Sequence, residues 1–146
     1  MRVDAYTLNR LQTIVWPALE SGYDLPGGLL NAISNWETRG TFENGSISSS
    51  GARGIFQLTP IALKQIKIDS GSSIDPSNVY SASVGAALLL TRFHRLFSGQ
   101  TPLMVAAYNA GEGTVKKFIR DTAATGQGFL PNETKMYILN VVPMVS

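Results

Sequence analysis

The chain has 146 residues, no cysteine, one histidine and a formal net charge of +2 at pH 7. We expect one domain over residues 1–146, long enough to bury about two-thirds of its unfolded surface. The lack of cysteine excludes disulfides and thiolate metal sites, and a single histidine leaves little for a zinc site or a serine–histidine–aspartate triad. The weak charge, with no basic run longer than Lys116-Lys117, argues against nucleic acid as a partner.

The first two predicted helices lead to one acidic residue. Asp4 can cap a helix with an apolar stripe through Leu8 and Val15, whose last turn Pro17 would disturb. A second helix is expected to begin at Pro26 and to continue over residues 29–37. It ends at Glu37.

The middle of the sequence is a polar loop followed by longer helices. Residues 39–54 are rich in Gly, Ser and Asn without periodicity, which predicts a loop holding at most a small β-hairpin. A tight helical turn is expected at 55–58, and Thr59-Pro60 should open a third helix that runs to Lys67. Further helices are predicted over residues 79–97, 103–110, from Thr114, and from Asn132 or Thr134. The fold class is therefore all-α.

Glu37 is unusually placed for a charged residue. Leu30, Ile33 and Glu37 lie three and four residues apart, so a helix puts the carboxyl on its apolar stripe. Desolvation against Ile33 and Trp36, together with the negative end of the helix dipole, would raise the pKa of Glu37. The alternative is a solvated acid at a helix end.

Four segments in order carry a family resemblance. They are Glu37-Thr38; residues 51–60, GARGIFQLTP; residues 107–111, AYNAG; and residues 133–138, ETKMYI. Together they resemble the lytic transglycosylase domain of the soluble transglycosylase family, a lysozyme-like fold that cleaves peptidoglycan. The family's Asn-Pro after the acid is missing here, Phe56 replaces a common methionine, and the loop before Gly51 is slightly long.

The resemblance implies roles for the matching residues. Glu37 would be the catalytic acid and base, while Ser48, Gln57, Tyr108, Asn109 and Glu133 would contact the glycan, with Gly54, Phe56 and Tyr137 in support. Gly51 and Gly54 would let the backbone approach a ligand closely, and the ring and hydroxyl of Tyr108 would position the acid. The structural alternatives are a surface amide for Gln57, a core tyrosine for Tyr108, and helix-end residues at Asn109 and Glu133.

A single-acid mechanism is expected from these residues. Glycosidases ordinarily use two carboxylates, but Glu43, Asp69, Asp75 and Asp121 have no motif support. Glu37 alone would protonate the leaving oxygen and then accept the proton of the C6 hydroxyl, which gives a 1,6-anhydromuramic end. This needs a pKa raised from about 4.3 towards about 6, which costs roughly 2 kcal/mol. No metal or cofactor is implied.

Three alternatives stay open. The first is a muramidase, which would use water on the same fold. The second is a peptidoglycan-binding module without catalytic turnover. The third is a helical nucleic-acid-binding domain, which the small net charge disfavours. No segment of the sequence reads as a signal peptide or as a span of the bilayer. We therefore expect delivery with a phage particle, as an endolysin, or by a secretion machine, whose proteins would be further partners.

Overall fold

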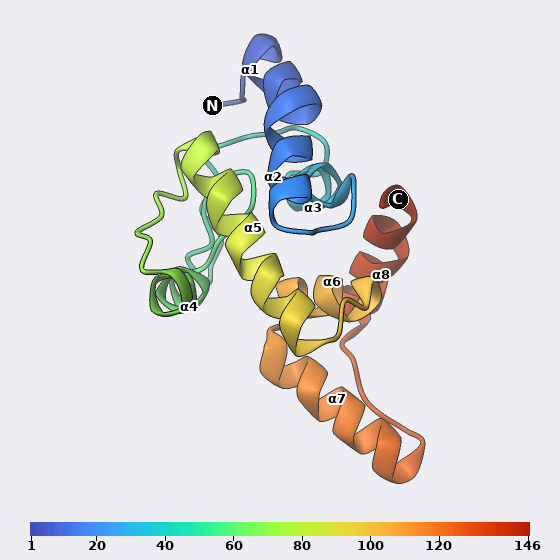
Figure 1. Cartoon of the computed structure of the whole chain (residues 1–146). Coiled ribbons are helices and arrows are strands. Elements are labelled where there is room, and N and C mark those ends of the chain that lie inside the picture. The colour runs from blue at the N-terminus through green and yellow to red at the C-terminus, as the bar shows by residue number, and fades with distance from the viewer.

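The N-terminal helix is one continuous run with a widened turn (Figure 1). The structure, a computed structural model, describes residues 1–146. The run comprises α1 (Ala5–Arg10), a π-helical segment η1 (Leu11–Val15) and α2 (Trp16–Gly22), and the Asp4 carboxylate accepts the Thr7 N–H at 2.8 Å as expected. In an ordinary α-helix the Pro17 ring would clash with the carbonyl four residues earlier. The widened turn η1 lies just before Pro17, so the disturbance falls on the preceding turn instead of the last turn.

The second helix begins later than the sequence predicted. Helix α3 spans Leu29–Glu37, and Gly28 before it has a φ of +85°. This left-handed residue breaks the helical path between Pro26 and Leu29, so the expected start at Pro26 is wrong. The predicted end at Glu37 is correct.

Residues 39–59 form a loop held by isolated β-bridges. Ile47 pairs with Arg53, and Arg53 pairs with Leu58. The expected helical turn at 55–58 is a hydrogen-bonded turn, in which the Gln57 N–H donates to the Gly54 carbonyl at 3.1 Å. Thr59 caps α4 (Pro60–Ser70), which is three residues longer than expected.

The C-terminal half packs around a central helix. Its elements are α5 (Val79–Leu96), α6 (Thr101–Ala110), α7 (Glu112–Thr125), α8 (Asn132–Val141) and a 3-10 turn η2 (Val142–Met144). Helix α5 runs through the middle, α6 packs against α5, α7 and α8, and α7 projects from one end (Figure 1). Helix α3 also contacts α8, so the two elements that carry Glu37 and the 133–138 segment meet.

One hydrophobic core joins these helices. Leu11, Leu29, Phe56, Leu90 and Tyr137 belong to the same buried cluster although they lie on different elements. The chain has no strand beyond isolated bridges, so the prediction of an all-α fold is confirmed. None of the helices combines the length and apolar character that crossing a membrane requires.

Candidate active site

Glu37 ends α3 beside a buried tyrosine. The hydroxyl of Tyr137, on α8, donates a hydrogen bond to Oε2 of Glu37 at 2.8 Å. Tyr137 is 1% exposed, and its ring lies edge-to-face with Trp36 at a centroid distance of 6.2 Å. Packing of α3 on α8 thus holds the carboxyl in place from the far end of the chain.

The surroundings of Glu37 favour its protonated form. The pKa of Glu37 is raised from 4.5 to about 7, chiefly because burial penalises the charged form. The Tyr137 hydrogen bond lowers it and the Glu133 charge raises it within that net shift. A carboxyl with a pKa near 7 can both donate and accept a proton at neutral pH. The same burial and the charge of Glu37 raise the pKa of Tyr137, which keeps the phenol protonated as a donor.

A second buried acid anchors the start of α3. Glu20 is 4% exposed, and its carboxylate accepts the backbone N–H groups of Gly28 at 3.1 Å and Leu30 at 2.8 Å. Burial raises the pKa of Glu20, whereas these hydrogen bonds lower it. The sequence reasoning did not single out Glu20, although Gly28 in front of α3 leaves the helix without a side-chain cap of its own.

Tyr108 serves the site through a different bond from the one expected. Its hydroxyl donates to the carbonyl of Phe56 at 2.6 Å, so the predicted bond to Glu37 is wrong and Tyr137 makes that bond. Burial, and after it the charge of Glu37, raise the pKa of Tyr108, which keeps its phenol protonated as a donor. Tyr108 therefore ties α6 to the turn at 54–57.

Phe56 and Gly54 support the fold of that turn. The Phe56 ring is fully buried and meets Trp16 edge-to-face at 5.6 Å, so it belongs to the core. A Cβ on Gly54, whose φ is +74°, would collide with the carbonyl oxygen of Pro76. The close approach expected at Gly54 is therefore an approach to the protein's own backbone.

Gln57 and Ser48 form hydrogen bonds within their own loop. The Nε2 of Gln57 donates to the carbonyls of Gly54 at 2.9 Å and Ser46 at 3.3 Å, which leaves its amide oxygen as an acceptor. The Ser48 hydroxyl accepts the Ala52 N–H at 3.1 Å and lies 2.9 Å from the Ser50 hydroxyl. Their expected contacts with glycan stay predictions.

Asn109 joins the end of α6 to the start of α8. Its Oδ1 accepts the Thr134 hydroxyl at 2.7 Å, and its Nδ2 lies 3.5 Å from Oε1 of Glu133. Asn109 thereby fixes the first turn of α8, which carries Glu133. The charge of Glu133 in turn raises the pKa of Glu37. The structure brings these two segments together, as the four-segment pattern implied.

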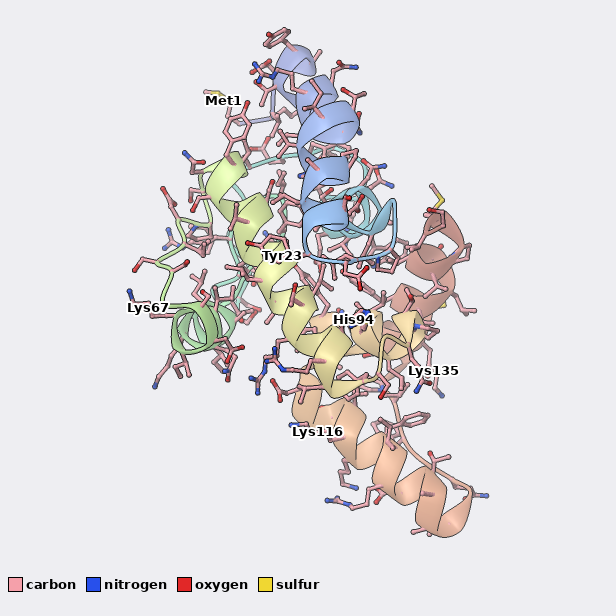
Figure 2. The ribbon with its side chains drawn as sticks, in the orientation of Figure 1. Met1, Tyr23, Lys67, His94, Lys116 and Lys135 are labelled. Atoms are coloured by element: carbon pink, nitrogen blue, oxygen red, sulfur yellow. The ribbon has the colours of Figure 1, made fainter.

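Four of the other acids form ion pairs. Asp69 and Glu112 pair with Arg92, Asp121 pairs with Lys117, and Glu43 binds the amino group of Met1. No group of three or more potential metal-ligating side chains gathers anywhere in the chain. Figure 2 shows Lys67, Lys116 and Lys135 on three separate elements, α4, α7 and α8.

Two hollows adjoin the residues around Glu37. One, of about 300 Å³, lies between α4, α5 and α6 and is bordered by Tyr108 and Asn109. The other, of about 720 Å³, lies where α3 ends and α8 begins and is lined by Asn35, Trp36, Arg39, Gly40 and Glu133. Both have the size of sites that hold small ligands.

This arrangement defines an all-α protein with a partly buried carboxyl of raised pKa, Glu37, and two ligand-sized hollows lined by residues around it. Residues 15–128 match the transglycosylase SLT domain. The chain belongs to this family. The matched residues include Glu37, Gln57 and Tyr108, whereas Glu133 and Tyr137 lie beyond them.

Similar proteins support this assignment. The chain is 35% identical over 104 residues to membrane-bound lytic murein transglycosylase D of Escherichia coli K12, covering 66% of this chain and 23% of that protein. Two solved structures share the fold. One is the 70 kDa soluble lytic transglycosylase of Escherichia coli, with a TM-score of 0.76 and 21% identity; the match covers 89% of this chain and 22% of that one. The other is an inactive mutant of the Pseudomonas aeruginosa transglycosylase Slt, with a TM-score of 0.75 and 24% identity; the match covers 88% of this chain and 22% of that one. The chain spans under a quarter of the length of each.

Proposed function

We propose that residues 1–146 form one lysozyme-like domain that cleaves peptidoglycan as a lytic transglycosylase. The bond would be the β-1,4 bond between N-acetylmuramic acid and N-acetylglucosamine, and the product a 1,6-anhydromuramic end. Membership of the transglycosylase SLT family supports this reaction class. The observation that carries the proposal is the partly buried Glu37, whose pKa of about 7 fits both halves of the reaction.

The reaction uses one acid twice. Protonated Glu37 gives its proton to the glycosidic oxygen as the bond from that oxygen to C1 breaks, and the acetamido oxygen of the muramic residue bonds to C1 in its place. The C6 hydroxyl oxygen then displaces the acetamido oxygen from C1, and its proton returns to Glu37. No water is consumed, and the acid is restored for the next cycle.

Tyr137 and Glu133 set the proton affinity of this acid in opposite directions. The hydroxyl of Tyr137 stabilises the carboxylate that exists between the two steps, whereas the Glu133 carboxylate favours the protonated state that starts the cycle. Ser48, Gln57, Tyr108 and Asn109 would contact the glycan, with the free amide oxygen of Gln57 as an acceptor for a sugar N–H.

The position of Glu133 also favours a second candidate, a muramidase. Hydrolysing glycosidases use a pair of carboxylates across the scissile bond, and Glu133 lies close enough to Glu37 to influence its ionisation. In that case Glu133 would activate water or act as nucleophile. In the transglycosylase it lines the groove and contacts the glycan.

Purified bacterial sacculi distinguish these candidates. We expect Glu37→Gln to lose lysis while folding normally, and Glu133→Gln to keep a substantial part of it, because only Glu37 carries the proton. A loss in Glu133→Gln as complete as in Glu37→Gln would favour the muramidase. Wild-type lysis by Glu37→Gln would end both proposals, and tight binding of sacculi without release of fragments would show a binding module.

Delivery to the wall is a separate proposal. We propose that the domain acts on the wall as part of a phage particle, as an endolysin or through a secretion machine. Co-purification of the native protein with virions or with a secretion complex would test this.

A further inference from the structure

The hollow at the end of α3 is lined by side chains that the cleavage mechanism does not use, apart from Glu133. Its lining combines an aromatic ring, two polar groups and one cation, supplied by Trp36, Asn35, Glu133 and Arg39. Glu133, whose charge raises the pKa of Glu37, is part of this lining, so the hollow lies on the Glu37 side of the molecule. On the basis of the proposed function, the occupant is a segment of the glycan.

Trp36 offers a fixed surface for a sugar ring. It is 37% exposed, and its ring is braced edge-to-face against the buried Tyr137 at 6.2 Å. A half-exposed, braced aromatic ring presents an apolar face on which the C–H face of a pyranose can pack without ordering a flexible side chain. The same brace links the sugar position to the tyrosine that bonds Glu37.

Arg39 occupies a backbone position that suits glycine better. Its φ is +53°, in the left-handed region. The turn follows the usual helix ending, with the Gly40 N–H donating to the Asn35 carbonyl at 2.8 Å and the Arg39 N–H donating to the Trp36 carbonyl at 3.1 Å. A non-glycine residue here is strained, and strained residues cluster at ligand sites.

The guanidinium of Arg39 is not used to stabilise the fold. None of the ion pairs in the structure includes Arg39, and the side chain is exposed. Glu133, the one acid in the hollow, lies near Nδ2 of Asn109 and forms no ion pair with Arg39. The cation is therefore available to an anionic ligand.

The chemistry of the glycan indicates which of its groups Arg39 can bind. Its sugar hydroxyl and acetamido groups are neutral, and the anionic groups lie on the lactyl branch of the muramic residue, either as the free lactyl carboxylate or as carboxylates of the attached peptide. A guanidinium binds a carboxylate through two parallel hydrogen bonds. We propose that Trp36 and Arg39 form a subsite in which the ring supports a sugar and Arg39 binds a carboxylate of the lactyl branch.

Two substrates distinguish the source of the carboxylate. One is glycan with its peptides attached, and the other is glycan freed of peptides by an amidase, which leaves the lactyl carboxylate. We expect Arg39→Gln to lower kcat/KM roughly 10- to 100-fold, as loss of a charge-assisted hydrogen bond does. The lactyl carboxyl is free only in the amidase-treated glycan, because the attached peptide converts it to an amide. A loss on the peptide-free glycan alone therefore identifies the lactyl carboxylate, a loss on the peptide-bearing glycan alone identifies a peptide carboxylate, and a loss on both shows that Arg39 binds either one.

Matched variants separate binding from folding and from net charge. Arg95→Gln removes the same charge from an exposed position on α5 outside the hollow, and should leave kcat/KM unchanged on both substrates. Arg39→Gly should raise the melting temperature by about 2–4 °C, because glycine relieves the left-handed strain, yet lower kcat/KM as Arg39→Gln does. A purely structural role for Arg39 would change the melting temperature only.

The result that overturns the subsite is equal activity of Arg39→Gln and Arg95→Gln on both substrates. This failure differs from failure of the proposed function, in which the wild-type protein itself releases no fragments from either glycan. A wild-type enzyme that cleaves both glycans, with no effect of Arg39→Gln, would sink only the subsite.

Discussion

Replacing Glu37 with glutamine should stabilise the protein in a pH-dependent way. Burial raises the pKa of Glu37 from 4.5 to about 7, so between these values the folded protein holds a proton that the unfolded chain has lost. The free energy of unfolding of the wild type therefore falls as pH rises through this window. At about 1.36 kcal/mol per pKa unit, the loss reaches on the order of 3 kcal/mol above pH 7.

Glutamine removes this titration and keeps an oxygen that can accept the Tyr137 hydroxyl. Denaturant unfolding at intervals from pH 4.5 to 8.5 should therefore show Glu37→Gln equal to the wild type at the acid end and more stable by roughly 3 kcal/mol at the basic end. A difference that stays constant across this range, or a variant less stable than the wild type at pH 8, would refute the buried, protonated carboxyl.

Glu112 provides a control, because its pKa is shifted in the opposite direction to that of Glu37. Its hydrogen bonds and ion pairs with Arg92 and Lys116 lower the pKa of Glu112 to about 2. Its contribution to stability is therefore present above pH 4.5 and is lost as pH falls towards 2. Glu112→Gln should be less stable than the wild type at neutral pH, in contrast to Glu37→Gln.

Three further predictions concern the residues around the acid. The alkaline limb of the activity profile should follow the pKa of Glu37, which Tyr137 lowers and Glu133 raises. Tyr137→Phe should therefore move this limb to higher pH and Glu133→Gln should move it to lower pH. Shifts of the two variants in the same direction would contradict this. Gly54→Ala should unfold at a much lower denaturant concentration than Gly71→Ala. Both glycines have a positive φ, but only a Cβ on Gly54 would meet a backbone carbonyl. Equal unfolding midpoints for the two variants would argue against that packing. Glu20→Ala should lose about 2–4 kcal/mol in the same assay and Glu20→Gln less, because alanine leaves two N–H groups of the α3 start without an acceptor.

Local patterns predicted the helix that carries the acid and the elements around it. The spacing of Leu30, Ile33 and Glu37 correctly predicted a helix that ends at the carboxyl, and cap residues such as Asp4 and Thr59 correctly marked helix starts. These features depend on neighbours within one or two turns, which a sequence shows directly. The resemblance added that the 107–111 and 133–138 segments belong near Glu37.

Contacts between distant residues were beyond the sequence. Tyr108 and Tyr137 both lie near Glu37, yet the packing of α3 on α8 gives the bond to Tyr137 and leaves the Tyr108 hydroxyl to the Phe56 carbonyl. Glu20 carries no local signal that distinguishes it from a surface acid, and the docking of α2 on α3 makes it a buried cap. Side-chain partners of this kind are decided by tertiary packing, on which local periodicity carries no information.

The masses of the fragments released from purified sacculi test the central claim most directly. If Glu37 works alone and takes its proton back from the C6 hydroxyl, each new muramic end should be lighter by one water than a reducing end and should carry no label when the digestion is run in ¹⁸O-water. Reducing ends that contain ¹⁸O would show that water is the attacking group, and would contradict the single-acid reaction.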